Sequence, residues 1–326
     1  MAFLQYSQRF FRPISDMSEK FNVLQAAMAS SERIFSLLDE PVAVRSPASP
    51  VHRSGSAAGH IVFENVWFAY KNEDYVLRDV SFEVKPGQRV GIVGATGAGK
   101  STITNLLLRF YDVNRGRITV DGVDIRELDL ADLRGLVSLV LQDVHLFSGT
   151  IADNIRLGNQ ALGDDQVRRA ARAVHADVFI ERLPAGYGGA VAERGSTLSV
   201  GQKQLLSFAR ALAFEPRVLI LDEATSSVDT DTELLIRDAL HVLMAGRTTI
   251  AIAHRLSTIQ DMDRILVLHK GHLRNPARTR KLIAQRGIYY RLFELQFKNG
   301  EQPADGQSDV RRQRSRSRRR LKRLLT

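Results

Sequence analysis

A run of nine residues, GATGAGKST at 94–102, constrains this chain more than any other feature. It lies between an apolar run, RVGIVG, that predicts a buried strand and a segment, STITNLLLRFY, that predicts a helix. The phosphate-binding pattern G-x-x-x-x-G-K-[ST] requires this order of strand, turn and helix. Glycines in the turn let backbone N–H groups point inward, and the helix start adds a positive end. The run therefore predicts a polyphosphate site, in preference to a glycine-rich turn that happens to precede a helix.

Two carboxylates are expected to complete this site. The segment VLILDEATSSVD predicts a buried strand that ends at Asp222 and Glu223. Carboxylates beside a phosphate are costly without a cation, so Asp222 and the Ser101 hydroxyl are expected to bind Mg²⁺. Glu223 suits orienting and deprotonating an attacking water, while Lys100 reaches the terminal phosphates. An acidic turn at a strand end is the alternative, which the pairing with Lys100 disfavours.

Strands and helices alternate from about residue 61, a pattern typical of a mostly parallel sheet covered on both faces. Residues 41–60 are rich in Pro, Ser, Ala and Gly and predict a linker. After Asn299 the chain becomes polar and then arginine-rich, which predicts disorder. The predicted division is an N-terminal helix in 1–40, a linker in 41–60, a nucleotide-binding domain in 61–299 and a basic tail in 300–326.

Apolar residues spaced by four and three predict a helix over 10–38, with Pro13 in its first turn or at a kink. An apolar stripe of this kind needs partner helices to pack against. The segment is therefore either a short coiled-coil arm or one helix cut away from a helical bundle. The members of the stripe are Phe10, Ile14, Met17, Phe21, Leu24, Met28, Phe35 and Leu38.

The net charge of +10 is confined to the C-terminal tail. Nine of the 46 Lys and Arg lie in 311–323, which leaves 37 basic against 36 acidic residues elsewhere. The body is thus nearly neutral, and only the tail suggests binding to anionic lipid or nucleic acid. The absence of cysteine excludes a disulfide scaffold. Without an apolar run of the length that a membrane helix needs, the chain is not expected to span a bilayer.

Between the two halves of the predicted site lies LSVGQKQLLSFARAL at 198–212, which resembles the signature of the ABC ATPase family, LSGGQ followed by a basic and apolar helix. Val200 replaces the middle glycine, as in export-type members. The resemblance implies that Ser199, Gly201 and Gln202 contact the ATP held by a partner subunit. Ser199 and Gln202 also form a capping box, and this cap points the first amides of the helix at an anion.

Other matches follow in the family's order. The resemblance implies that Tyr70 stacks on adenine and that Gln142 touches Mg²⁺ or water. It also implies that Asp229 contacts the partner subunit across the dimer interface and that His254 contacts the γ-phosphate. Each has a structural alternative: a core tyrosine, a polar loop residue, a helix cap and a structural histidine. The residues expected to hold ATP from within the chain are Tyr70, Gly94, Ala95, Thr96, Gly97, Ala98, Gly99, Lys100, Ser101 and Thr102.

Three segments resemble exporters within this family. ERGSTLS at 193–199 is similar to the exporter approach to the signature, the arm at 7–41 (1–40 in the division above) looks like the cytoplasmic end of the last transmembrane helix with its connector, and GIYYRLFELQF at 287–297 looks like the exporters' closing helix. The segment at 272–282 departs from them, because exporters usually carry an acidic stretch there. The resemblance implies a P-loop NTPase (RecA-like) core with an antiparallel β subdomain, a helical subdomain and a long N-terminal helix.

The resemblance also implies an Mg²⁺-dependent ATPase in which ATP closes two such domains and drives export. The partners would be a second nucleotide-binding domain and an exporter's transmembrane domain, largely absent from this sequence. The expected location is the cytoplasmic face of the cell membrane. One alternative is a soluble ABC ATPase that acts on nucleic acid or ribosomes through its basic tail. The other is an idle dimerisation module, which the intact Lys100, Glu223 and His254 disfavour.

Overall fold

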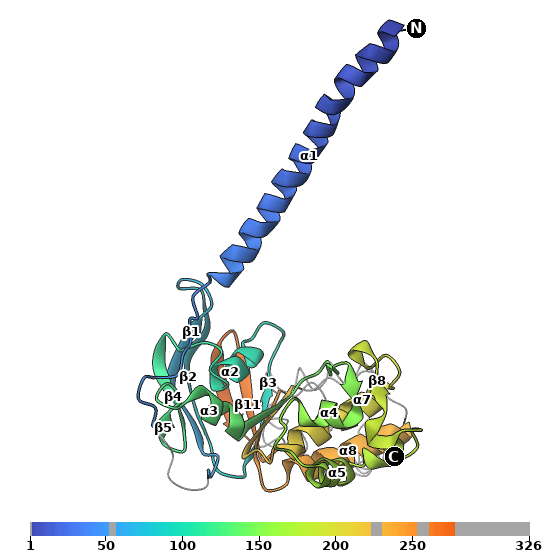
Figure 1. The fold of residues 1–326 in the computed structure, drawn as a ribbon. Helices are drawn as coiled ribbons and strands as arrows, with labels where there is room; N and C mark the ends of the chain where they lie inside the picture. The colour runs from blue at the N-terminus through green and yellow to red at the C-terminus, as the bar shows by residue number, and fades with distance from the viewer. Residues whose placement is uncertain (1, 52–56, 223–229, 253–260, 278–326) are drawn as a thin grey trace, which may run out of the picture. The chain divides into compact units, whose positions relative to one another are not determined.

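The computed structural model describes all residues except 1, 52–56, 223–229, 253–260 and 278–326. The chain divides into two compact units, Met1–Arg45 and Ser46–Thr326. The first contains α1 (Ala2–Leu38), which Figure 1 shows as one continuous helix. Because α1 begins well before the predicted residue 10, Pro13 lies inside the helix, and its predicted first-turn position is wrong.

The predicted apolar stripe of α1 is exposed along its whole length. Phe10, Met17 and Leu38, for example, are 67%, 72% and 71% exposed. Within the first unit, the helix therefore has an apolar face that the described residues of that unit do not bury. No helix in the described residues combines the length and the apolar content that crossing a bilayer requires.

An antiparallel sheet opens the second unit. Its strand order is β2-β1-β4-β5, with bounds β1 (Ile61–Ala69), β2 (Tyr75–Val84), β4 (Arg115–Val120) and β5 (Val123–Asp124). Alternate residues of β1 point inward, and Phe63 stacks on Phe82 of β2 with ring centroids 4.4 Å apart. The burial of one face fixes the register of this sheet.

In the part of the chain that the structure describes, the central sheet has six strands in the order β12-β11-β3-β10-β9-β6. Neighbouring strands are parallel except β11 and β12, which form an antiparallel edge. Their bounds are β3 (Arg89–Val93), β6 (Val137–Val140), β9 (Val218–Asp222), β10 (Thr248–Ile252), β11 (Arg264–His269) and β12 (His272–Ala277).

Helices cover both faces of this sheet. Val218 and Ile220 of β9 pack in one core with α2, whereas Leu219 and Leu221 pack in a second core with α5, α7 and α8. This explains why the strands are continuous apolar runs. The helices are α2 (Lys100–Leu107), α3 (Leu130–Leu136), α4 (Ile151–Arg156), α5 (Asp164–Ala173), α6 (Asp177–Ile180), α7 (Val200–Ala213) and α8 (Thr230–Met244).

Short elements connect the helical part, which Figure 1 shows gathered around α4, α5, α7 and α8. They are the paired strands β7 (Gly149–Thr150) and β8 (Ala190–Val191) and the 3-10 turns η1 (Gly186–Gly188) and η2 (Glu193–Gly195). The predicted α/β core with an antiparallel and a helical part is confirmed.

Helix α2 ends four residues before the predicted segment does. Arg109 adopts φ 49° and its guanidinium donates to the Asp112 carboxylate at 2.8 Å, so the chain turns away after Leu107. Within the predicted linker, the Ser46 hydroxyl accepts from the Leu130 amide at 3.0 Å. The predicted closing helix at 287–297 and the tail at 300–326 lie outside the described residues.

Candidate functional site

The predicted phosphate loop, residues 94–102, connects the end of β3 to the start of α2. Gly97 and Gly99 have φ of 77° and 102°, which side chains with a Cβ rarely adopt. Gly99 is the N-cap of α2, and among the described residues no side chain caps that end. The first amides of α2 are therefore available to a ligand with negative charge.

Strand β11 and the turn after it press against this loop. A Cβ on Gly94 would lie 2.3 Å from the Leu268 carbonyl oxygen, so only glycine is accommodated there. The Gly271 amide donates to the Ala98 carbonyl at 3.3 Å. Leu268 and Gly271 were not predicted as part of the site. In the sequence, a Lys-Gly turn between two apolar runs is all that points to this contact with the loop.

Lys100 is 7% exposed and lies under the loop. Its ammonium group donates to the carbonyl oxygens of Gly94 at 2.9 Å and Ala95 at 3.1 Å. Burial lowers the pKa of Lys100, while the Asp222 carboxylate acts in the opposite direction. A charged group in this setting gains from an anion that replaces the carbonyl oxygens, as a bound phosphate would.

Tyr70 lies beside the same helix, with its hydroxyl 3.2 Å from Oγ1 of Thr102 and accepting from Asn105 at 3.3 Å. Edge contacts with Phe68 and Tyr111 hold the ring, which is nevertheless 45% exposed. An aromatic ring that is held in place and partly open is suited to stacking on a base. Asn105 and Tyr111 were missed by the sequence reasoning.

The structure brings Gln142 and Asp222 together. Strands β6 and β9 are parallel neighbours, so their carboxyl ends meet at the same edge of the sheet. Both side chains line a hollow of about 10 Å³ that Gln204 and Phe208 of α7 close from one side. The Coulombic effect of Asp222 on Lys100 links this edge to the phosphate loop. Lys100, Gln142 and Asp222 therefore belong to one region.

Helix α7 begins as its sequence predicts. Ser199 is the N-cap: its hydroxyl accepts from the Gln202 amide at 3.2 Å, and the Gln202 side chain accepts from the Ser199 amide at 3.0 Å. The predicted capping box is confirmed. Val200 is 52% exposed and Gly201 is buried. Among the described residues, no hydrogen bond joins 199–202 to 94–102, so the structure does not bring the two motifs together within one chain.

Arg210 of α7, which the sequence reasoning missed, ties this helix to the segment that follows Gln142. Its guanidinium donates to the carbonyl oxygens of Asn154 at 2.9 Å and His145 at 3.2 Å. Asn154 is 2% exposed and in turn binds both backbone groups of Phe147. Burial lowers the pKa of Arg210. A half-buried cation held by carbonyl oxygens makes this connection costly to remove.

Turn η2 packs against the same segment. A Cβ on Gly195 would lie 2.7 Å from Cδ1 of Leu146, and the Lys203 ammonium donates to the Arg194 carbonyl at 3.0 Å. The residues before the signature motif are therefore in contact with those after Gln142. Three predicted site residues, Glu223, Asp229 and His254, lie outside the described residues.

Comparisons with known proteins agree on one family. The family model described as ABC transporter matches residues 77–226. The chain is 48% identical over 297 residues to an uncharacterized ABC transporter ATP-binding protein, YknV, of Bacillus subtilis, covering 91% of this chain and 49% of that protein. It is 48% identical over 291 residues to a fatty acid ABC transporter ATP-binding/permease protein of Mycobacterium tuberculosis, covering 89% and 46%.

A third relative, an ATP-dependent lipid A-core flippase of Chromobacterium violaceum, is 42% identical over 298 residues, covering 91% of this chain and 50% of that protein. The solved structure of a bacterial Atm1-family ABC exporter with ATP bound is similar with a TM-score of 0.75 and 38% identity, covering 92% of this chain and 52% of that one. The chain thus spans about half the length of the relatives it matches.

Proposed function

The chain contains the ATP-binding domain of an ABC transporter, close to the exporter type, and on this premise we propose that it binds and hydrolyses ATP to drive an exporter. The observation that carries this proposal is the position of Lys100. Its buried ammonium group is held under the phosphate loop and within the field of Asp222. A triphosphate bound there would meet a fixed cation and the uncapped start of α2.

The donors near this point suit Mg²⁺. The Ser101 hydroxyl, the Gln142 amide oxygen and the Asp222 carboxylate are hard oxygen ligands, and Mg²⁺ usually takes few protein ligands beside phosphates and water. We propose that these three residues hold the ion. When bound, Mg²⁺ would neutralise charge on the phosphates. The Coulombic link between Asp222 and Lys100 supports their sharing one ligand.

In the proposed hydrolysis, Glu223 orients the attacking water and accepts its proton, and His254 donates a hydrogen bond to the γ-phosphate. Lys100 and the loop amides stabilise the charge on the oxygens of the phosphate that is transferred. The ring of Tyr70 stacks on the adenine, which fixes the nucleotide against α2.

Ser199, Gly201 and Gln202 are proposed to complete the site of a second copy or a related domain. They lie at a capped helix start whose amides suit an anion, and no hydrogen bond in the described residues ties them to the chain's own loop. Asp229 would contact the partner across the same interface. ATP makes contacts to both domains only when they close, so its binding favours closure.

The transmembrane domain of an exporter is the proposed second partner, which would place this domain at the cytoplasmic face of the membrane. The movement on closure would be transmitted to the transmembrane domain through the segment after Gln142. Arg210 and Gly195 connect the signature region to this segment. The relatives described above are named as transporters, which favours this role over a soluble ATPase that acts on nucleic acid or ribosomes.

The experiment is a comparison of Glu223→Gln, Lys100→Ala and Glu127→Gln in the full chain. Glu223→Gln should bind ATP as the parent does and lose at least about a hundredfold in turnover. Lys100→Ala should lose both binding and turnover. Glu127→Gln, the same change at an exposed carboxylate outside the site, should leave both unchanged. Undiminished turnover in Glu223→Gln would contradict the role of Glu223 as the base. Unchanged ATP binding in Lys100→Ala would contradict the proposed nucleotide site.

A further inference from the structure

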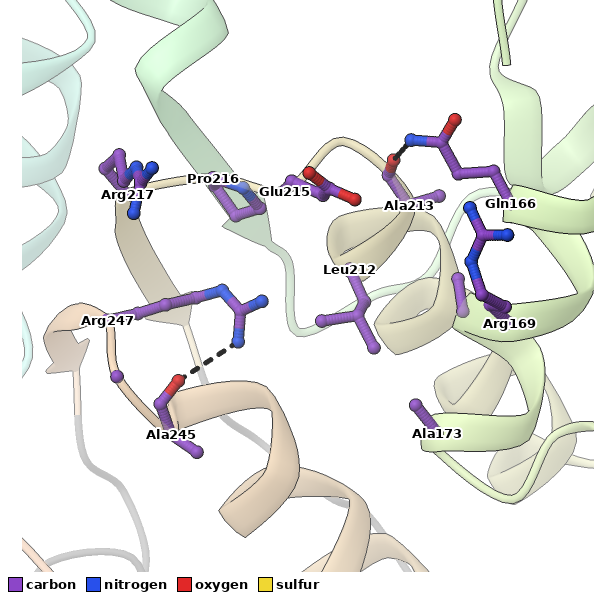
Figure 2. A pocket seen from close by; sticks show the side chains of 12 residues that line it. Gln166, Arg169, Ala173, Leu212, Ala213, Glu215, Pro216, Arg217, Ala245 and Arg247 are labelled. Atoms are coloured by element: carbon purple, nitrogen blue, oxygen red, sulfur yellow. Dashed lines mark hydrogen bonds between the residues drawn. The ribbon is translucent and has the colours of Figure 1, made fainter. Parts of the chain in front are cut away.

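A second hollow, of about 380 Å³, lies at the amino ends of the central strands β9 and β10. Figure 2 shows the side chains that line it. It opens where β9 and β10 begin, beside Arg217 and Arg247, whereas the phosphate loop follows the end of β3. Strand β10 runs parallel to β3, and a five-residue strand spans roughly 16 Å. The hollow is therefore separate from the nucleotide site.

The lining of this hollow is positively charged. Arg169, Arg217 and Arg247 contribute three guanidinium groups, and Glu215 contributes the one carboxylate among the lining residues. The remaining space is bounded largely by small residues. Gly246, for example, could carry a Cβ without meeting any atom within 4 Å. The described residues leave this hollow unfilled, and arginines outnumber carboxylates in its lining.

Hydrogen bonds hold the Arg247 side chain in place, and its burial disfavours the charged form. Its Nη1 donates to the carbonyl oxygens of Leu243 at 3.0 Å and Ala245 at 3.2 Å, which caps the end of α8. Burial lowers the pKa of Arg247; Glu215 opposes this and the like charge of Arg217 adds to it. A bound anion would offset both the burial and the repulsion.

Arg169 approaches from a different wall. It lies on α5, is exposed, and makes no ion pair with any residue that the structure describes. Three residues before Arg169, the Gln166 side chain donates to the Ala213 carbonyl at 3.0 Å, which ties α5 to the end of α7. Figure 2 shows Arg169 and Arg247 on different walls, with Gln166 bonded to Ala213. The Gln166 bond therefore connects the wall that carries Arg169 to the end of α7.

We propose that this hollow binds a small anion with two phosphate groups, one held by Arg169 and the other by Arg247. The planar guanidinium fork matches a phosphate in geometry and charge. The two guanidinium groups of Arg169 and Arg247 on different walls would each attract one phosphate group of such a ligand. The carboxylate of Glu215 acts electrostatically on Arg247 and therefore opposes the binding of an anion there. This inference does not depend on the proposed ATPase function.

Inorganic pyrophosphate is the probe, titrated without Mg²⁺ into the full chain by calorimetry. Pyrophosphate should also enter the phosphate loop, so we expect two sites in the parent. Lys100→Ala should keep one site, and Arg169→Gln should keep only that of the phosphate loop. In the Lys100→Ala background, Arg169→Gln should weaken the remaining site at least about tenfold. Comparing the parent with Arg169→Gln gives the same answer if Lys100→Ala does not fold.

Arg172→Gln is the matched control, because Arg172 is an exposed arginine of the same helix that does not line the hollow. It should leave pyrophosphate binding unchanged, and Glu215→Gln should tighten it by removing the competing carboxylate. Equal weakening in Arg169→Gln and Arg172→Gln would show a general charge effect and overturn the proposal. A single site in the parent, lost in Lys100→Ala, would overturn it as well.

Discussion

At the scale of single residues, the ammonium group of Lys100 has opposite consequences for folding and for binding. Its burial removes a charge from water, and two carbonyl oxygens replace that hydration only in part. The same burial leaves the charge unscreened for a phosphate. A residue of this kind is expected to make the empty protein less stable and the bound protein more stable.

The lowered pKa of Lys100 gives a pH dependence with a definite sign. In the pH range between the lowered pKa and the ordinary lysine value, the unfolded chain holds a proton that the folded chain has lost, so stability rises with pH there. Lys100→Met removes this contribution. Without ligand, we expect Lys100→Met to be the more stable protein at neutral pH and its advantage to shrink at alkaline pH. Denaturant unfolding at both pH values measures the difference, in which other titrating groups cancel; a widening advantage would contradict the assigned burial.

Gly94 and Gly135 form a matched pair of glycines. A Cβ on Gly94 would lie 2.3 Å from the Leu268 carbonyl oxygen, whereas a Cβ on Gly135 would meet nothing within 4 Å. Gly94→Ala should lower the free energy of unfolding by about 2 kcal/mol or more and abolish ATP binding. Gly135→Ala, in α3, should be neutral or stabilise by up to about 1 kcal/mol. Chemical denaturation and nucleotide titration test both, and similar costs in the two variants would show that the contact with β11 is unimportant.

At the scale of the elements, helix starts serve two purposes in this fold. Both α4 and α7 begin with a capping box, at Thr150 and at Ser199. The box at Thr150 satisfies amides within the domain. The box at Ser199 does this too, and in the proposed dimer it also directs amides at a partner's nucleotide.

Ser199→Ala and Thr150→Ala should therefore differ in function and agree in stability. Each removes a capping hydroxyl and should cost about 1 kcal/mol of unfolding free energy. Only Ser199→Ala should lower ATP turnover beyond what its stability loss explains. Thermal unfolding and steady-state ATPase rates in the same buffer separate the two effects. Equal loss of turnover in both variants would mean that Ser199 acts only as a helix cap.

Local signals predicted the elements that local chemistry determines. The strand before Gly94, the strand that ends at Asp222 and the cap at Ser199 all follow from apolar runs and capping residues. The end of α2 was missed because it depends on the ion pair that Arg109 forms with Asp112 after a turn. The start of α1 was missed because the predicted stripe began only at Phe10.

Contacts between distant segments could not be predicted in this way. The packing of Leu268 on Gly94 and the bonds from Arg210 to His145 join residues far apart in the sequence, and no spacing rule connects them. The pairing of Gln142 with Asp222 depends on β6 lying next to β9, a strand order that one sequence does not specify. Their membership of one site came from the family resemblance alone.

At the scale of the whole molecule, the chain holds a nucleotide-binding unit and an exposed amphipathic helix. Every described residue proposed to bind ATP lies in the unit Ser46–Thr326. The apolar side chains of α1 are exposed instead of being buried in a core. An exposed stripe of this length favours association with other apolar surfaces.

Removing residues 1–45 should therefore separate binding from self-association. The shortened chain keeps Ser46, which bonds to the Leu130 amide, and all described residues of the site. Its affinity for ATP should stay within about twofold of the parent's, and its tendency to associate without nucleotide should fall. Sedimentation velocity and nucleotide titration measure the two quantities. A large loss of affinity would show that the first unit contributes to the site.

The position of β3 in the sheet has a consequence for the newly synthesised protein. Its two neighbours, β10 and β11, are encoded roughly 160 and 175 residues further along the chain. While the ribosome is still adding those residues, the strand that leads into the phosphate loop has neither hydrogen-bonded neighbour. Nucleotide in the cell therefore cannot support the early stages of folding, and the nascent chain depends on late-emerging segments before it gains a ligand that stabilises it.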